Sequence, residues 1–230
     1  MTTPQHNLAV IKVVGIGGGG TNAIKRMIGE GMTGVDFIAL NTDEQDLLDC
    51  DAPTKLDIGQ STTRGLGAGA DPAVGERAAR DNSQDIEDVL TGADMVFVTA
   101  GEGGGTGTGG APIVAGIARG LGALTVAVVT KPFSFEGKRR ADNAEHGIEK
   151  LRDACDTLIT IPNDRLLQQE DKTISINEAF SKADEVLFNG VQGITDLIST
   201  PGLINVDFAD VKSVLAAVSY THLTLPTTPY

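Results

Sequence analysis

The sequence lacks tryptophan and is poor in aromatic residues generally, with two Tyr and seven Phe among its 230 residues. A core with so few rings has to be built from aliphatic side chains, and 40% of the residues are hydrophobic. This composition suits α/β packing, in which parallel strands buried on both faces form near-continuous apolar runs. A chain of this length can bury one substantial core, or one domain and part of a second.

Only two cysteines, Cys50 and Cys155, occur, and they lie far apart in the chain. They form no Cys-x-x-Cys motif, and they have no spacing with His of the kind that binds zinc. The sequence therefore indicates neither a disulfide framework nor a zinc site. We expect both residues to be buried or reduced thiols.

The sequence has fewer basic residues than acidic ones: 18 Lys and Arg and 31 Asp and Glu, which gives a net charge of −13. Binding to nucleic acid or to anionic lipid depends on basic patches, so this balance argues against both kinds of partner. An acidic protein can still bind an anionic nucleotide where backbone amides and a metal ion meet the phosphates.

No apolar run approaches the roughly 18 residues of a membrane-spanning helix. The start, MTTPQHNLAVIKVVGIG, has no basic region or cleavage site of a signal peptide, and Lys12 interrupts its apolar part. We therefore expect a cytoplasmic protein without direct membrane insertion.

The chain also lacks the G-x-x-x-x-G-K-[ST] motif of common nucleoside triphosphatases. What it has is a glycine-rich stretch, Ala100–Pro112, in which seven of thirteen residues are Gly. An apolar run at 95–99 precedes it with strand character, and a helical pattern at 113–118 follows. Such a loop leaves backbone N–H groups open at the positive end of a helix, where an anion is favoured. We expect it to bind phosphate through backbone amides, without a lysine.

A second glycine loop lies near the start, where a buried-type strand at 8–14 leads into Gly15–Gly20 and a helix from about residue 21. Gly15, Gly17 and Gly20 satisfy G-x-G-x-x-G, and Asn41 and Asp43 end the next strand about where a Rossmann enzyme keeps its ribose-binding acid. An NAD-binding Rossmann enzyme is therefore an alternative. Two convergent glycine loops favour instead the longer phosphate chain of a nucleoside triphosphate.

The remaining pattern alternates strands and helices. A single helix is expected from Asp71-Pro72 to about Leu90, after a loop at 59–71, and a long helix at 175–199. Further elements are expected as strands at 35–40, 54–58, 124–130 and 158–161, and as a helix from about 140 to 154. This alternation predicts an α/β fold: a mostly parallel, Rossmann-like sheet with helices on both faces, plus the long central helix.

Gly103–Gly109, GGGTGTG, resembles the phosphate-binding signature of the tubulin/FtsZ GTPase family, and the flanking MVFVTAGEG and GGAPIVA are similar to its bacterial branch. The resemblance covers about residues 8–216, and the second domain of the family is missing. It implies a GTP-hydrolysing, polymerising protein of bacterial cell division that uses GTP/GDP and Mg²⁺. Another reading is a nucleotide-binding module that is inactive alone because it is truncated.

Phe180 and Asp184 are four residues apart on one face of the long helix. This pair suits guanine, because the ring can stack on the base and the carboxylate can accept from N1–H and the exocyclic amine. Adenine offers no such pair of donors, so Asp184 would select GTP. We expect Asn22 to reach the other edge of the base.

The resemblance assigns further residues to the nucleotide. Those expected at the phosphates are Gly18, Gly19, Gly20, Thr21, Gly103, Gly104, Gly105, Thr106, Gly107 and Thr108. Those expected toward the γ-phosphate are Ala68, Gly69 and Ala70, and those on the sugar side are Glu136, Arg140 and Asn163.

Asn205, Asp207 and Asp210 match the family's catalytic N-x-D-x-x-D loop, and they follow the far end of the long helix. That helix separates them from Asp184 by tens of ångströms, so another subunit would have to complete the site. Stacking the loop of one copy on the nucleotide of the next gives a head-to-tail filament, because a heterologous contact does not close on itself.

The expected organisation is a tail at 1–7, a GTP-binding domain at 8–174, the central helix at 175–199, and the catalytic loop with the start of a helix at 200–218. Residues 219–230, SYTHLTLPTTPY, have no helical period and depart from the family. Other division proteins would bind through the missing C-terminal part. The resemblance implies a cytoplasmic protein at the division site.

Overall fold

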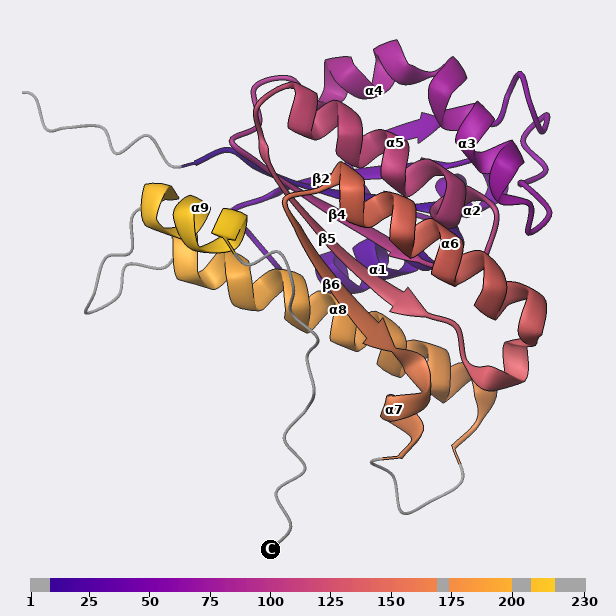
Figure 1. Ribbon diagram of the computed structural model, residues 1–230. Coiled ribbons are helices and arrows are strands. Elements are labelled where there is room, and N and C mark those ends of the chain that lie inside the picture. Colours follow the sequence, from indigo (N-terminus) through magenta and orange to yellow (C-terminus); the bar gives the residue numbers. More distant parts are fainter. Residues whose placement is uncertain (1–8, 169–173, 200–207, 218–230) are drawn as a thin grey trace, which may run out of the picture.

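The computed structural model describes residues 9–168, 174–199 and 208–217. Six strands form one sheet in the order β3-β2-β1-β4-β5-β6, and every neighbouring pair is parallel (Figure 1). The strands are β1 (Ile11–Ile16), β2 (Asp36–Asn41), β3 (Thr54–Asp57), β4 (Met95–Gly101), β5 (Leu124–Lys131) and β6 (Thr157–Pro162). The expected parallel Rossmann-like sheet is confirmed.

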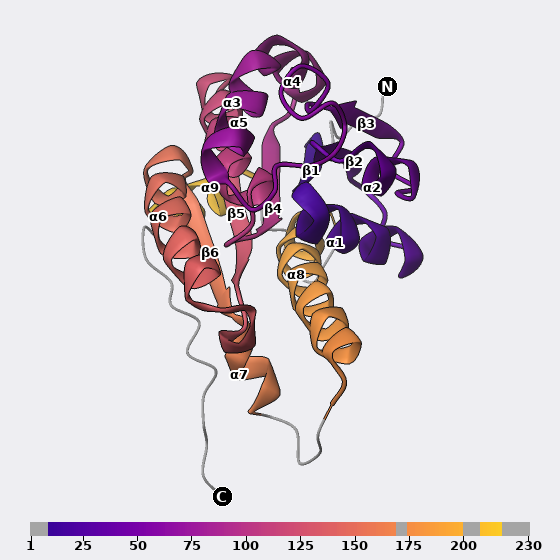
Figure 2. The ribbon, with the colours of Figure 1, turned by 90° about the vertical axis from the view of Figure 1, so that its right-hand side faces the viewer.

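Helices cover both faces of the sheet (Figure 2). They are α1 (Gly17–Gly29), α2 (Glu44–Leu48), α3 (Pro72–Asp81), α4 (Ser83–Leu90), α5 (Thr106–Gly120), α6 (Lys138–Ala154), α7 (Asn163–Leu167), α8 (Ile176–Ser199) and α9 (Phe208–Ala217), with a 3₁₀ turn η1 (Ser134–Glu136). One apolar layer joins α3 to α6 to the sheet, and the other joins α1, α7 and α8 to the opposite face. Both layers are largely aliphatic, as the shortage of aromatic residues required.

Both glycine-rich segments become helical earlier than the sequence suggested. α1 begins at Gly17 instead of near residue 21, and α5 begins at Thr106, so Gly107–Pro112 belongs to a helix and not to a loop. Close packing explains part of this glycine content: a Cβ on Gly109 would lie 2.0 Å from the carbonyl oxygen of Pro72. These glycines let α3 and α5 pack backbone to backbone.

The single helix expected from Asp71 to Leu90 was wrong, because the chain forms two helices that meet at Asn82. The Asp71 side chain caps α3 by accepting from the Ala73 N–H, as expected. The Asn82 amide donates to the carbonyl oxygens of Ile58, at 3.1 Å, and Ala78, at 2.8 Å. Asparagine side chains that bond to nearby backbone in this way compete with the helix, so the chain turns there.

The long helix α8 matches its expected bounds closely, and α9 spans Phe208–Ala217 within the region where the start of a helix was expected. No helix among the described residues is long and apolar enough to cross a membrane. The tails expected at 1–7 and 219–230 lie outside the described residues, as do Asn205 and Asp207.

Candidate nucleotide-binding site

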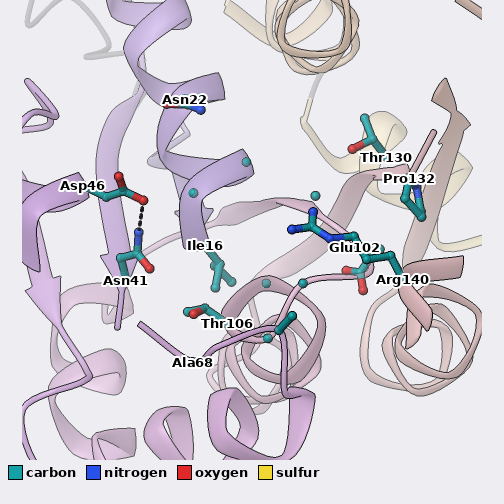
Figure 3. A pocket seen from close by; sticks show the side chains of 18 of the residues that line it. Ile16, Asn22, Asn41, Asp46, Ala68, Glu102, Thr106, Thr130, Pro132 and Arg140 are labelled. Carbon is teal, nitrogen blue, oxygen red and sulfur yellow. Dashed lines mark hydrogen bonds between the residues drawn. The ribbon is translucent and has the colours of Figure 1, made fainter. Parts of the chain in front are cut away.

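A cavity of about 440 Å³ opens at the carboxyl ends of β1, β4 and β5 (Figure 3). The strand order reverses between β1 and β4, and in open α/β sheets ligands bind at this switch point. The starts of α1 and α5, the loop at 67–70 and the first half of α8 contribute to its lining. Its size is that of an ordinary small-molecule site.

The two glycine-rich helix starts meet at this cavity. Gly17 has φ +68°, and a Cβ there would lie 2.9 Å from the backbone nitrogen of Gly107. Neither α1 nor α5 has a side-chain cap at its N-terminus, so no side chain takes up the first N–H groups of either helix. The predicted phosphate-site residues that line the cavity are Gly18, Gly19, Gly104, Gly105, Thr106 and Gly107. Two helix dipoles and a set of backbone donors therefore converge where an anion would be stabilised.

Four residues expected at the phosphates do not line the cavity: Gly20, Thr21, Gly103 and Thr108. They lie behind the residues that do. A Cβ on Gly20 would lie 2.5 Å from the carbonyl oxygen of Thr99, and the Thr21 hydroxyl donates to the carbonyl of Gly18. Gly103 has φ +105°, and its N–H donates to the Thr108 hydroxyl at 2.8 Å. These residues hold the loops in place without facing the cavity.

Ala68, Gly69 and Ala70 line the same cavity, together with Gly67. The loop turns through positive φ at Gly67, Gly69 and the non-glycine Ala70. Two contacts fix it: the Gly67 N–H donates to the carbonyl of Thr42 at 2.9 Å, and the Asn143 amide donates to the carbonyl of Ala70 at 3.3 Å. The structure therefore brings this loop to the two helix starts, and its contact with a γ-phosphate stays a prediction.

The pair predicted for guanine also lies in the lining, with Asn22 from α1. Phe180 is 40% exposed, and its ring packs edge-on against Phe133 at 5.4 Å between centroids. Burial raises the pKa of Asp184 to about 6, and the charges of Arg26 and Lys25 offset part of that rise. Asp184 is thus mainly ionised at neutral pH and available as an acceptor.

Glu136, Arg140 and Asn163, which were expected on the sugar side, all line the cavity. Glu136 pairs with Arg140 at 2.7 Å and also accepts from the Phe133 N–H at 2.9 Å. Asn163 is 4% exposed, and its Oδ1 has no hydrogen-bond partner among the described residues. A buried acceptor without a donor is a place where a ligand hydroxyl would fit.

Sequence reasoning missed an acidic side of the cavity. Asn41 and Asp43 had been noted only for the NAD alternative, and Asp46 not at all, yet all three line it. Asp46 Oδ2 accepts from the Asn41 amide at 3.2 Å and lies 3.2 Å from where a Cβ on Gly18 would stand. The signal was the position of these residues at the carboxyl end of β2, with Asp43 capping a short helix that had not been expected.

The remaining residues in the lining had no individual contact assigned from sequence, although Gly17, Gly101 and Glu102 belong to the two predicted glycine loops. They are Ile16, Gly17, Gly67, Gly101, Glu102, Thr130, Pro132, Ala183 and Leu187. Most of them are small or apolar and complete the walls. Glu102 is the exception, because it brings a carboxyl group to the phosphate loop itself.

Asp210, the described member of the predicted catalytic set, lies in the first turn of α9 and not at the cavity. α9 packs at the amino ends of the strands, where the Thr157 hydroxyl donates to the carbonyl of Leu215. α8 separates the two places, since Ser199 follows Asp184 by fifteen residues, or roughly 22 Å of helix. Figure 1 shows α9 beside the far end of α8.

Comparisons with known proteins agree with this geometry. The family model described as Tubulin/FtsZ family, GTPase domain, matches residues 10–171. An empty FtsZ dimer structure from M. jannaschii is 50% identical with a TM-score of 0.89, and the match covers 92% of this chain and 62% of that one.

Two more distant structures share the fold. They are a GDP-bound CetZ1 monomer from Haloferax volcanii (TM-score 0.76, 24% identity, covering 90% of this chain and 64% of that one) and a GTPγS-bound CetZ2 protofilament from the same organism (0.69, 22%, 94% and 60%). This chain thus spans less than two thirds of the length of these relatives. The chain belongs to the tubulin/FtsZ family and contains that family's GTPase domain.

Proposed function

We propose that this chain binds guanine nucleotides in the cavity between α1, α5 and α8, and that the domain hydrolyses GTP when copies assemble. The observation that carries the proposal is the convergence of two glycine-rich helix starts on one cavity that also contains Phe180 and Asp184. Backbone amides of Gly18, Gly19 and Gly104 would hold phosphate oxygens, with the helix dipoles adding a favourable field.

Base selection in this proposal depends on Asp184. Its carboxylate would accept from two guanine donors, Phe180 would cover the base, and Asn22 would contact the other edge. The buried Oδ1 of Asn163 would accept from a ribose hydroxyl, beside the Glu136–Arg140 pair. Family membership disfavours the NAD-binding alternative, although the strand order alone suits both.

Mg²⁺ would lie on the acidic side of the cavity. Within the described ranges no three His, Cys, Asp or Glu residues form a metal cage. Mg²⁺ fits such a site, because proteins usually bind it through one or two carboxylates together with substrate phosphates and water. Asp46 and Asp43 are the carboxylates in position, and the ion would neutralise charge on the phosphates.

Hydrolysis would need a second copy. Asp210 lies on α9 at the opposite end of α8 from the base pocket, so it cannot reach the nucleotide of its own subunit. We propose that Asn205, Asp207 and Asp210 of one copy orient the attacking water at the γ-phosphate of the next, in a head-to-tail filament. By family membership the filament would serve bacterial cell division, in the cytoplasm at the division site, with other division proteins as further partners.

A pair of substitutions tests nucleotide binding. A Cβ on Gly104 meets no atom within 4 Å, so Gly104→Asp would fit the fold while placing a negative charge in the cavity. Gly116, on α5, is equally open and does not line this cavity, so Gly116→Asp is the matched control. We expect Gly104→Asp to weaken GTP binding in a calorimetric titration by at least about tenfold, ~1.4 kcal/mol. Equal affinities of the two variants would remove the loop from the site.

A further inference from the structure

Glu102 is a buried carboxyl in the phosphate loop that the proposed mechanism does not use. It is 4% exposed and lies between Gly101 and Gly104, which line the cavity. Neither carboxyl oxygen has a hydrogen-bond partner among the described residues. Burial raises its pKa to about 8, and the neighbouring Thr108 hydroxyl offsets only part of the rise. At neutral pH the group is therefore mostly protonated.

The side chain is confined between two helices. A Cβ on Gly147 of α6 would lie 2.6 Å from Glu102 Oε2 and 2.4 Å from Cγ2 of Thr108 on α5. The Glu102 backbone N–H is fixed to the carbonyl of Thr130 on β5 at 2.9 Å. In Figure 3, Glu102 lies on the same side of the cavity as Arg140. The carboxyl group thus has little room to move while the loop keeps this shape.

Two cations of α6 already have partners. On α6, Arg140 pairs with Glu136 and Lys150 pairs with Glu76 of α3. The Thr108 hydroxyl of α5 neighbours Glu102, and Thr130 of β5 also lines the cavity; neither side chain carries a charge. The Glu102 carboxyl has no ion-pair partner among the described residues, and an uncompensated buried charge is costly.

We propose that protonated Glu102 is a positioning residue of the phosphate loop, and that its ionisation weakens nucleotide binding; this rests on the proposed function. The Thr108 hydroxyl, which neighbours Glu102, accepts from the Gly103 N–H and so helps to hold the loop in place. An ionised Glu102 adds a negative charge beside the phosphates, which repels them. Bound phosphate, in turn, favours the protonated form.

The proposal predicts the direction in which the affinity for nucleotide changes with pH. As pH rises through 8, a growing share of the protein must take up a proton before it can bind nucleotide. Affinity should then fall, by about tenfold between pH 7 and pH 9. Glu102→Gln keeps the shape of the neutral side chain and cannot ionise, so it should remove this fall.

The test is a calorimetric titration of the chain with GTP at pH 6.5, 7, 8 and 9, for wild type, Glu102→Gln and Glu149→Gln. Glu149 is an exposed carboxylate of α6 and serves as the control. Protons that titrate on GTP or on Asp184 affect all three proteins, so the ratio of affinities isolates Glu102. At pH 8, wild type and Glu149→Gln should take up a fraction of a proton on binding, measured from the heats in two buffers, and Glu102→Gln should take up less.

Parallel pH profiles for wild type and Glu102→Gln would overturn the proposal. So would a loss of binding at pH 9 that follows loss of the far-ultraviolet circular dichroism signal, because the effect would then be one of stability. If no protein binds GTP at any pH, the proposed function fails and this proposal fails with it. Binding with equal slopes overturns the role of Glu102 alone.

Discussion

At the level of single residues, two opposing effects set the pKa of Asp184. Burial raises the pKa to about 6, and the charges of Arg26 and Lys25 limit the rise. Because only the ionised carboxylate accepts from both guanine donors, preference for GTP over ATP should fall as pH drops below 6. Asp184→Asn should lose the preference at every pH. Competition titrations at pH 5.5 and 7.5 measure the affinity ratio, in which effects on the phosphates cancel. A wild-type ratio in Asp184→Asn would contradict the assignment to the base.

Glu102 also makes a prediction about stability. Its pKa is about 8 when folded and near 4.5 when unfolded, so the folded state binds more protons between these values. The free energy of unfolding should therefore fall as pH rises from 4.5 to 8, by up to about 5 kcal/mol, and change no further above 8. Urea unfolding at pH 5 to 8 should show that the free energy of unfolding of Glu102→Gln rises relative to that of wild type as pH increases. A difference that is constant with pH would mean that the carboxyl is not buried in this way.

Single residues differed in how well sequence revealed them. Phe180 and Asp184 could be placed on one helix face from the sequence because helical spacing is local, and both line the cavity. The environment of Glu102 depends on Gly147, 45 positions later in the chain (147 − 102), and no local pattern reports such a contact. Asp46 was missed for a similar reason, because the short helix that carries it had no strong period.

At the scale of elements, the glycines of α5 divide into two kinds that sequence reading could not separate. A Cβ on Gly109 would overlap the backbone of α3, whereas one on Gly116 meets nothing within 4 Å. Glycine content therefore reflects helix packing as well as ligand access. The break at Asn82 was hidden likewise, because it depends on a bond to Ile58 in a distant segment.

This division predicts opposite effects of one substitution at two places in α5. Gly109→Ala should destabilise the domain by at least about 2 kcal/mol, since α3 must move away. Gly116→Ala should stabilise it by about 0.5–1 kcal/mol, because alanine loses less backbone entropy in a helix. Thermal and urea unfolding of the two variants give the comparison. Destabilisation by Gly116→Ala as large as by Gly109→Ala would contradict the packing described for α3 and α5.

At the scale of the whole molecule, α8 joins two places with different proposed roles, the cavity at its start and α9 beyond its end. The parallel sheet followed from the alternation of strands and helices. That the two glycine-rich helix starts lie at one cavity followed from their shared phosphate-binding pattern. Which residues face it did not, because that depends on how α1, α5 and α8 pack together.

The shared site predicts complementation in a chain extended to the length of its relatives. Asp210→Ala would offer a sound cavity and an inactive loop, and Gly104→Asp the reverse. Gly104 is preferable to Gly107, where a Cβ would lie 2.8 Å from the carbonyl oxygen of Gly101 and would disturb the fold. Each variant alone should be nearly inactive, and mixing them should restore GTP hydrolysis at concentrations that allow assembly. Co-pelleting without restored hydrolysis would contradict action between subunits.

In the proposed function, this cavity holds a guanine nucleotide on the backbone of two helix starts. Denaturing the purified chain and identifying the released nucleotide by anion-exchange chromatography tests this binding. We predict GDP or GTP in near-stoichiometric amount from wild type and from Gly116→Asp, and little from Gly104→Asp. Release of an adenine nucleotide or NAD from wild type, or equal guanine nucleotide from all three proteins, would contradict the account.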